Sequence, residues 1–212
     1  MRRSVLLLAA VLAVAPARMS EAIAAPIAPV IADIPAGDYV LDKAHSHITF
    51  RISHLYVSSY AAHFTRFDAR LHLDPVHPDR ASIATTIDPN SLVLDTAPAG
   101  FRDLLLGPVL LDVKKFPAIA FQSTGVTMAA PDTARVMGNL SAHGVTRPVA
   151  LTVTFTGGTR AAPPERRARV AFTVKGKFKR SAFGLGYGSR LIAGDTVQVE
   201  IDAQFTCTAA SK

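Results

Sequence analysis

An alternation of apolar and polar residues with a period of two recurs through most of the chain. In residues 45–54, for example, Ile48, Phe50 and Ile52 lie on one face and polar residues on the other. This period is typical of a β-strand with one buried face. The pattern predicts about eight such strands. The clearest are residues 45–54, 66–73, 149–156, 169–178 and 197–205, and the weaker ones are residues 82–88, 118–127 and 134–143.

Strands of this kind form antiparallel sheets, and eight of them close into a barrel or stack as a sandwich. Turn residues such as Asp74–Pro75 and Gly157–Gly158 separate the apolar runs. Hydrophobic residues make up 49% of the chain and charged residues 18%, which excludes a disordered polyelectrolyte. Cys207 is the one cysteine, so no intramolecular disulfide can form, and we expect a packed thiol. The core must therefore supply the stability.

Residues 95–116 interrupt the alternation. Phe101, Leu105 and their neighbours suit one or two short helices that Gly107–Pro108 breaks and Pro117 ends. An apolar segment like this one must be covered by other residues. We expect it to plug or roof one end of a barrel.

The N-terminus has the features of an export signal. Arg2 and Arg3 precede an apolar stretch over residues 4–15, and small residues that suit cleavage occur at residues 15–17 and, as the favoured site, at residues 22–24. We interpret residues 1–24 as a signal peptide, residues 25–36 as a proline-containing linker, and residues 37–208 as the folded barrel. The protein is then expected outside the cytoplasm, in the periplasm.

The formal net charge is +7, yet the sequence contains neither a run of five Lys or Arg residues nor any Trp. A nucleic-acid-binding chain usually concentrates its positive charge, often among aromatic residues. We therefore exclude nucleic acid as a partner. Diffuse positive charge favours anionic surfaces or head groups instead.

Several motifs occur in an order that resembles the YceI-like family, whose members are polyisoprenoid-binding proteins with a lipocalin-like barrel. The most specific motif combines Gly138–Leu140 with His143–Val149 (GNL, then HGVTRPV). The resemblance covers about residues 39–205. The other matching motifs are residues 42–50 (DKAHSHITF) with Ser53 and His54, residues 87–91 (IDPNS), Arg102–Asp103, residues 115–121 (KFPAIAF), and Arg180–Ser181 with Phe183–Gly184 ahead of Gly194–Asp195.

The chain departs from the family pattern at three places. His63 stands where family members usually have Gly, and Ala182 stands where they usually have an acidic residue. The segment after Arg102–Asp103 is apolar here, Leu104–Leu105–Leu106, where relatives are more polar. These changes leave the strand pattern intact and bear on the identity of the ligand.

The resemblance and the pattern together imply an all-β, eight-stranded antiparallel lipocalin-like barrel with one or two short helices. Its apolar interior is expected to carry an isoprenoid, a polyprenyl or isoprenoid quinone, or another long-chain lipid. We expect no catalysis and no cofactor, while transient membrane contact and homodimer formation stay open. The predicted cavity residues are Ile48, Phe50, Ile52, Phe67, Phe101, Leu105, Phe121, Phe172 and Phe183, and the predicted head-group residues are His54, Arg102 and Arg180.

Two alternatives remain open at this point. In the first, His45 and His47 on one strand face hold the metal of a metal-dependent enzyme, although a third ligand is not evident from the sequence. In the second, the barrel is filled by its own side chains and acts as a structural or stress-protective protein. No nucleophile elbow, phosphate loop or dinucleotide-binding fingerprint occurs in the sequence, so no catalytic motif supports an enzyme.

Overall fold

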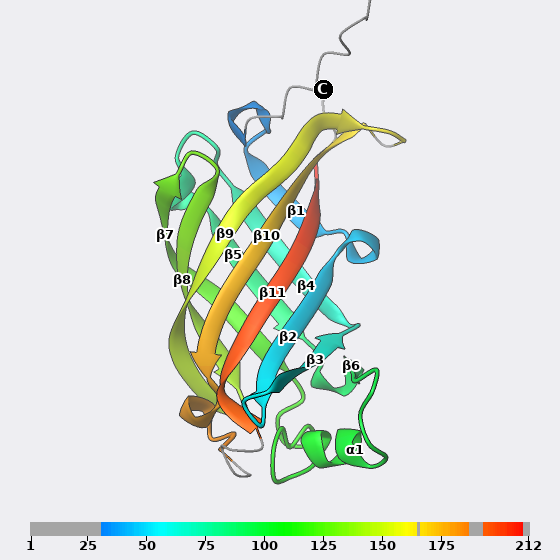
Figure 1. The fold of residues 1–212 in the computed structure, drawn as a ribbon. Helices are drawn as coiled ribbons and strands as arrows, with labels where there is room; N and C mark the ends of the chain where they lie inside the picture. The colour runs from blue at the N-terminus through cyan, green and yellow to red at the C-terminus, as the bar shows by residue number, and fades with distance from the viewer. Residues whose placement is uncertain (1–30, 165, 187–192, 210–212) are drawn as a thin grey trace, which may run out of the picture.

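The computed structural model describes residues 31–164, 166–186 and 193–209, in which eight antiparallel strands form a closed ring (Figure 1). The first and last strands of the ring pair through Tyr39 and Cys207 and so close the barrel. The fold confirms the predicted all-β eight-stranded antiparallel barrel. The ring runs in the order β1 (Gly37–Leu41), β4 (Phe67–Leu73), β5 (Ser82–Ile87), β7 (Ile119–Ala130), β8 (Thr133–Ala142), β9 (Val145–Ala162), β10 (Arg167–Lys179) and β11 (Ala193–Cys207).

Three further strands extend the sheet beyond the ring. β2 (His47–His54) pairs with the first part of β11, β3 (Ser58–Phe64) pairs with β2, and the short β6 (Leu92–Val93) pairs with β3. The sequence pattern did not predict β1, β3 or β6, because each is short or carries too few apolar residues to show the period.

The structure corrects the predicted strand over residues 45–54. β2 begins at His47, and His45 belongs to a short 3-10 helix, η2 (Lys43–His45). Asp42 caps this turn: its carboxylate accepts hydrogen bonds from the Ala44 N–H at 3.1 Å and from the Gln204 amide at 3.1 Å, and it also bonds the His45 ring at 2.9 Å. His45 therefore leaves the strand face because its ring turns back to Asp42.

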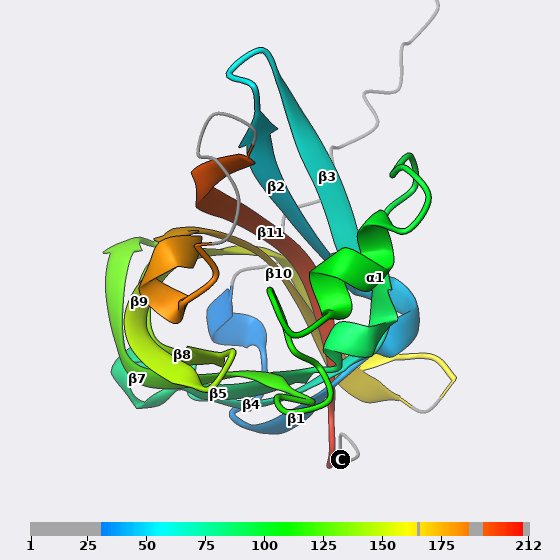
Figure 2. The same cartoon turned by 90° about the horizontal axis from the view of Figure 1, so that it is seen from below.

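The two ends of the barrel differ. At one end, called here the η1 end, lie η1 (Ile31–Asp33) and η3 (Pro78–Arg80), and Figure 2 shows η1 within the outline of the ring. At the other, called here the α1 end, lie α1 (Phe101–Leu106), η5 (Arg180–Phe183) and the turn between β2 and β3 (Figure 1). η4 (Pro89–Ser91) joins β5 to β6.

The predicted helical segment contains one short helix. α1 ends at Gly107, where the sequence pattern placed a break, and turns follow as far as Lys115. None of the helices in the described part of the chain has the length and apolar character that a membrane-spanning helix needs.

The packed body begins ahead of Gly37, within the segment interpreted as a linker. Ile34 is 3% exposed and belongs to the core cluster at the η1 end, and the Tyr39 hydroxyl donates a 2.6 Å hydrogen bond to the Pro35 carbonyl. Cys207 is buried in the same cluster as a free thiol, as expected. The predicted signal peptide lies outside the described residues.

The hydrogen bonds of the Asp42 carboxylate lead us to predict that the stability of the protein depends on pH. Burial by itself would raise the pKa of the Asp42 carboxyl, but hydrogen bonds from His45 and Ala44 and the charges of His45 and Arg169 hold it below its usual value of 3.8. A carboxyl group whose pKa is lowered by folding stabilises the native state above pH 3.8, and this contribution is lost as the pH falls through the folded-state value. Asp42→Asn is therefore expected to lower the free energy of unfolding above pH 3.8.

Urea titrations of the wild type and Asp42→Asn between pH 3 and 7 check this expectation. The difference between the two proteins should shrink as the pH falls below 3.8. Asp79→Asn removes the same charge at an exposed position in η3 and serves as the control. A difference that stays constant over the whole pH range would contradict the assigned role of Asp42.

Candidate functional site

The inward faces of the strands enclose an apolar cavity of about 620 Å³. On β10, for example, Phe172, Val174 and Phe178 line the cavity, whereas Thr173 between them is directed outward and donates a hydrogen bond to Asp202. The cavity extends from Ile31 at the η1 end to Tyr60 at the α1 end. Its volume falls in the usual range for a small-molecule site, about 300–1,000 Å³.

Two glycines explain why the large side chains of the wall leave this space open. A Cβ atom at Gly138 would lie 2.3 Å from the Phe121 ring, and one at Gly176 would lie 2.4 Å from Leu151. The ring and the leucine therefore approach the glycine backbone of the neighbouring strand more closely than any other residue would allow. The missing Cβ atoms make room for these two side chains at the wall.

The segment around α1 forms the rim of the cavity at the α1 end. Phe101, Leu104 and Leu105 of α1 line the cavity together with Leu110 and Leu111 from the turns that follow. Aromatic contacts join this segment to the β2–β3 hairpin, because the Tyr60 ring lies 4.6 Å from the His54 ring and 5.8 Å from the Phe101 ring. The helix and the hairpin therefore border one opening.

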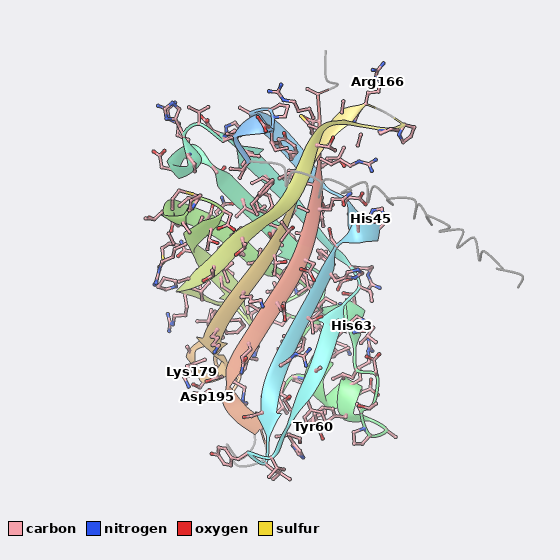
Figure 3. The ribbon with its side chains drawn as sticks, turned by 45° about the horizontal axis from the view of Figure 1, so that its top comes forward. His45, Tyr60, His63, Arg166, Lys179 and Asp195 are labelled. Atoms are coloured by element: carbon pink, nitrogen blue, oxygen red, sulfur yellow. The ribbon has the colours of Figure 1, made fainter. Side chains whose placement is uncertain are left out.

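Few polar side chains line the cavity, and most of them lie near its ends. His54, Tyr60 and Arg180 belong to the α1 end, and Asp132 belongs to the turn between β7 and β8. Figure 3 shows Tyr60 at the same end of the molecule as Lys179, next in sequence to Arg180, and Asp195. Ser82 and Thr85 of β5 also line the cavity, so hydrogen-bonding partners for the polar group of a long ligand lie mainly near the ends.

Arg180 is 7% exposed, and backbone carbonyls hold its guanidinium group in place. Nε donates to Gly194 at 3.1 Å, one terminal nitrogen donates to Ala193 at 2.9 Å, and the other donates to Leu185. Asp195 adds to this joint by accepting hydrogen bonds from the N–H and hydroxyl of Ser181. Arg180 thus ties η5 and Leu185 to the start of β11.

The most specific sequence motif also has a structural role at the α1 end. His143 and Gly144 form the turn between β8 and β9, both with positive φ angles of 52° and 72°. The His143 Nδ1–H donates to the Phe183 carbonyl at 3.2 Å, and the imidazole lies edge-on to the Phe116 ring at 5.0 Å. The turn therefore joins η5 to the segment that follows α1.

The structure brings most of the predicted cavity residues together and leaves two predicted residues outside the lining. Phe183 packs edge-on against Phe178 in a separate core cluster, because η5 turns its side chain away from the lumen. Arg102 donates to the carbonyls of Leu92 and Asn90, which directs it toward β6. The predicted residues that line the cavity are Ile48, Phe50, Ile52, His54, Phe67, Phe101, Leu105, Phe121, Phe172 and Arg180.

Sequence reasoning missed part of the lining. Tyr60 lies on β3, which the pattern did not predict. Leu104, Leu110 and Leu111 lie in a segment without regular alternation, so the sequence does not show which of its side chains face the cavity. The alternation itself could have identified Val153, Val174 and Val199, because each shares a face with a predicted residue.

The two histidines of the metal hypothesis do not lie on a common strand face. His45 belongs to η2 and bonds Asp42, while His47 starts β2 opposite Asp202. Across the residues that the structure describes, no group of three or more His, Cys, Asp or Glu side chains is arranged to hold a metal ion. The geometry therefore provides no third ligand for the predicted pair.

Comparison with known sequences identifies relatives over most of the chain. The family model of the YceI-like domain matches residues 39–205. A UPF0312 protein of Azotobacter vinelandii is 33% identical over 152 residues, which cover 71% of this chain and 77% of the relative. A UPF0312 protein of Yersinia pestis is 36% identical over 152 residues, with the same shares covered.

Solved structures share the fold. BcnA of Burkholderia cenocepacia superposes with a TM-score of 0.67 at 26% identity, over 77% of this chain and 98% of that one. A polyisoprenoid-binding domain of Saccharophagus degradans, implicated in plant cell wall breakdown, superposes with a TM-score of 0.61 at 15% identity, over 80% of this chain and 98% of that one.

Arg180 is predicted to be a structural residue whose loss weakens the whole barrel. Arg180→Met leaves three partly buried carbonyls without their donor, which is expected to lower the free energy of unfolding by about 2–4 kcal/mol. Arg147→Met is the matched control, because Arg147 is exposed and donates to the carbonyl of the adjacent Thr146. We expect a change within about 0.5 kcal/mol for this variant. Equal effects of the two substitutions in chemical denaturation would argue against the role assigned to Arg180.

Proposed function

The chain belongs to the YceI-like domain family, and we propose that it is an exported binding protein whose barrel holds an isoprenoid or a similar long-chain amphiphile. The observation that carries the proposal is the apolar cavity, which extends between the two ends of the barrel with polar side chains mainly near its ends. The name of the structural neighbour from Saccharophagus degradans supports the same class of ligand. The protein acts by binding, without catalysis.

The shape of the cavity suits a slender chain. Lining residues on β10 run from Phe172 to Phe178, which is roughly 20 Å along a strand at about 3.3 Å per residue. Each buried CH₂ group contributes about 0.8 kcal/mol, so a hydrocarbon tail in this space binds tightly without any specific chemistry. His54 and Tyr60 line the cavity at the α1 end, where the polar group of the ligand, a quinone oxygen or a prenyl phosphate, would lie.

The proposed export explains the signal peptide that the sequence predicts. Residues 1–24 are removed on secretion in this proposal, and the mature protein works in the periplasm. Mass spectrometry of protein purified from its own host is expected to give a chain that starts near Ala25, in the periplasmic fraction. Full-length protein that retains Met1 in the cytosolic fraction would overturn this part of the proposal.

Ligand binding predicts a contrast between neighbouring residues of β10. Val174→Trp places a bulky ring in the middle of the cavity, where Val153 and Ile201 lie beside it. If the ring displaces about four methylene groups of the tail, binding weakens by about 3 kcal/mol, or roughly 100-fold. Thr173→Trp is the control, because it adds the same ring to the outer face of the same strand.

The measurement is titration of each protein with a long-chain polyprenol, accompanied by native mass spectrometry of the lipid that co-purifies with it. Wild type and Thr173→Trp are expected to bind alike, and Val174→Trp is expected to bind a shorter chain or none. Identical lipid content in folded Val174→Trp would show that the ligand does not occupy the cavity. A wild-type protein without lipid or polyprenol affinity would favour the self-filled structural barrel instead.

A further inference from the structure

Large apolar side chains are exposed around the opening at the α1 end. Val57 is 84% exposed and Tyr56 is 73% exposed, and Leu55 completes the turn between β2 and β3. Across the opening, Leu104 and Val109 are exposed on α1 and the turn that follows it. These five residues are called the apolar rim below. Exposed aliphatic and aromatic groups that cluster on one surface mark an interaction site.

The β2–β3 turn, which carries three of these exposed residues, has an unusual backbone conformation. Leu55 and Tyr56 both have positive φ angles, 52° and 60°, and the Val57 N–H donates to the His54 carbonyl at 3.2 Å. Hairpin turns with positive φ at both central residues strongly prefer Asn-Gly, and bulky residues rarely adopt this conformation. The turn therefore maintains an unfavourable backbone conformation with apolar side chains at its tip, which is typical of functional positions.

The rim is continuous with the cavity. Leu104 is exposed and also lines the cavity, and the ring contacts from His54 through Tyr60 to Phe101 border the same opening. A surface that contacts the rim therefore also faces the interior of the barrel. A hydrocarbon chain could then move between that surface and the cavity with little exposure to water.

Positive charge surrounds the rim. Lys114 and Lys115 are exposed in the turn just before Phe116, and Lys179 lies at the same end (Figure 3). Cations outnumber carboxylates among the described residues of the α1 end. The exposed cations are Arg51, Arg66, Arg102, Lys114, Lys115, Arg147, Lys177 and Lys179, and the carboxylates are Asp95, Asp103, Asp112, Asp195 and Asp88, which pairs with Arg66.

We propose that the α1 end docks on the surface of an anionic lipid bilayer, with the apolar rim inserted among the lipid head groups and the surrounding lysines against their negative charge. Tyr56 suits this role because tyrosine is enriched at membrane–water interfaces. Lysines near an anionic membrane add a salt-dependent attraction. The inference rests on the proposed function, since docking in this orientation allows the ligand to pass between bilayer and barrel.

The test measures sedimentation of the mature protein with vesicles of phosphatidylcholine alone and of phosphatidylcholine with phosphatidylglycerol. The double variant Leu55→Asn, Tyr56→Gly gives the turn its preferred sequence, so we expect a higher Tm together with at least tenfold weaker vesicle binding. Val57→Ser keeps the turn and should weaken binding in the same direction. Val76→Ser is the matched control, because Val76 is 75% exposed but lies beside η3 at the η1 end.

The wild type should bind vesicles that contain phosphatidylglycerol more tightly than neutral vesicles, and Lys114→Ser with Lys115→Ser should reduce that difference. Equal binding of wild type and both turn variants, or no binding by the wild type, would overturn the docking proposal. Uptake of the fluorescent apolar probe N-phenyl-1-naphthylamine without vesicles tests the cavity separately, and the turn variants should retain it. If the wild type does not take up the probe, the result counts against the proposed function. The docking proposal is decided separately, by the vesicle-binding measurement.

Discussion

Closure of the barrel depends on β11, whose two ends pair with different strands. Val197 through Asp202 pair with β2, whereas Phe205 through Cys207 pair with β1. Between these two regions, residues 42–46 stand opposite Ala203 and Gln204. Ser46 accepts a hydrogen bond from the Gln204 N–H at 3.0 Å and donates one to the Asp42 carbonyl at 2.7 Å. These side chains replace the strand pairing that the break removes, so the sheet can close at one end and splay at the other.

The splayed end determines where the cavity opens. Once β2 and β3 leave the ring, the chain from β6 to β7 must cover the apolar interior there, and its Leu-rich segment does so only in part. At the opposite end, Ile31 and Ile34 pack over the barrel through η1. His54, Tyr60 and Arg180 lie at the splayed end, where water can reach polar groups, and the middle of the cavity can remain mainly apolar.

The sequence predicted the strands with long, regular alternation, because a side-chain period of two is a local property of the chain. The pattern alone left a barrel or a sandwich open, and the resemblance to the YceI-like family implied the barrel. Strands β1 and β3 were missed because β1 is short and pairs with the distant Leu73, while β3 has too few apolar residues to show the period. The residues of the candidate site also divide into those that alternation predicts and those that it does not. Phe50, Phe121 and Phe172 line the cavity as predicted, but Phe183 and Arg102 are directed elsewhere by turns that alternation does not describe.

Several residues of the motifs that identify the family hold the barrel together, while others, such as Phe50 and Phe121, line the cavity. Asp42, His143 and Arg180 each bind backbone groups or neighbouring side chains at a joint of the fold. The family match therefore carries strong information about the fold and weaker information about the ligand. Selectivity must come from lining residues outside these joints. The segment Leu104–Leu106 is the strongest candidate, because it departs from the family pattern and contributes Leu104 and Leu105 to the rim of the cavity. An apolar segment in place of a polar one at this position lowers the free-energy cost of moving a hydrocarbon tail into the cavity. It also removes hydrogen-bonding partners for a head group. Under the proposed function, this segment favours ligands whose polar group is small.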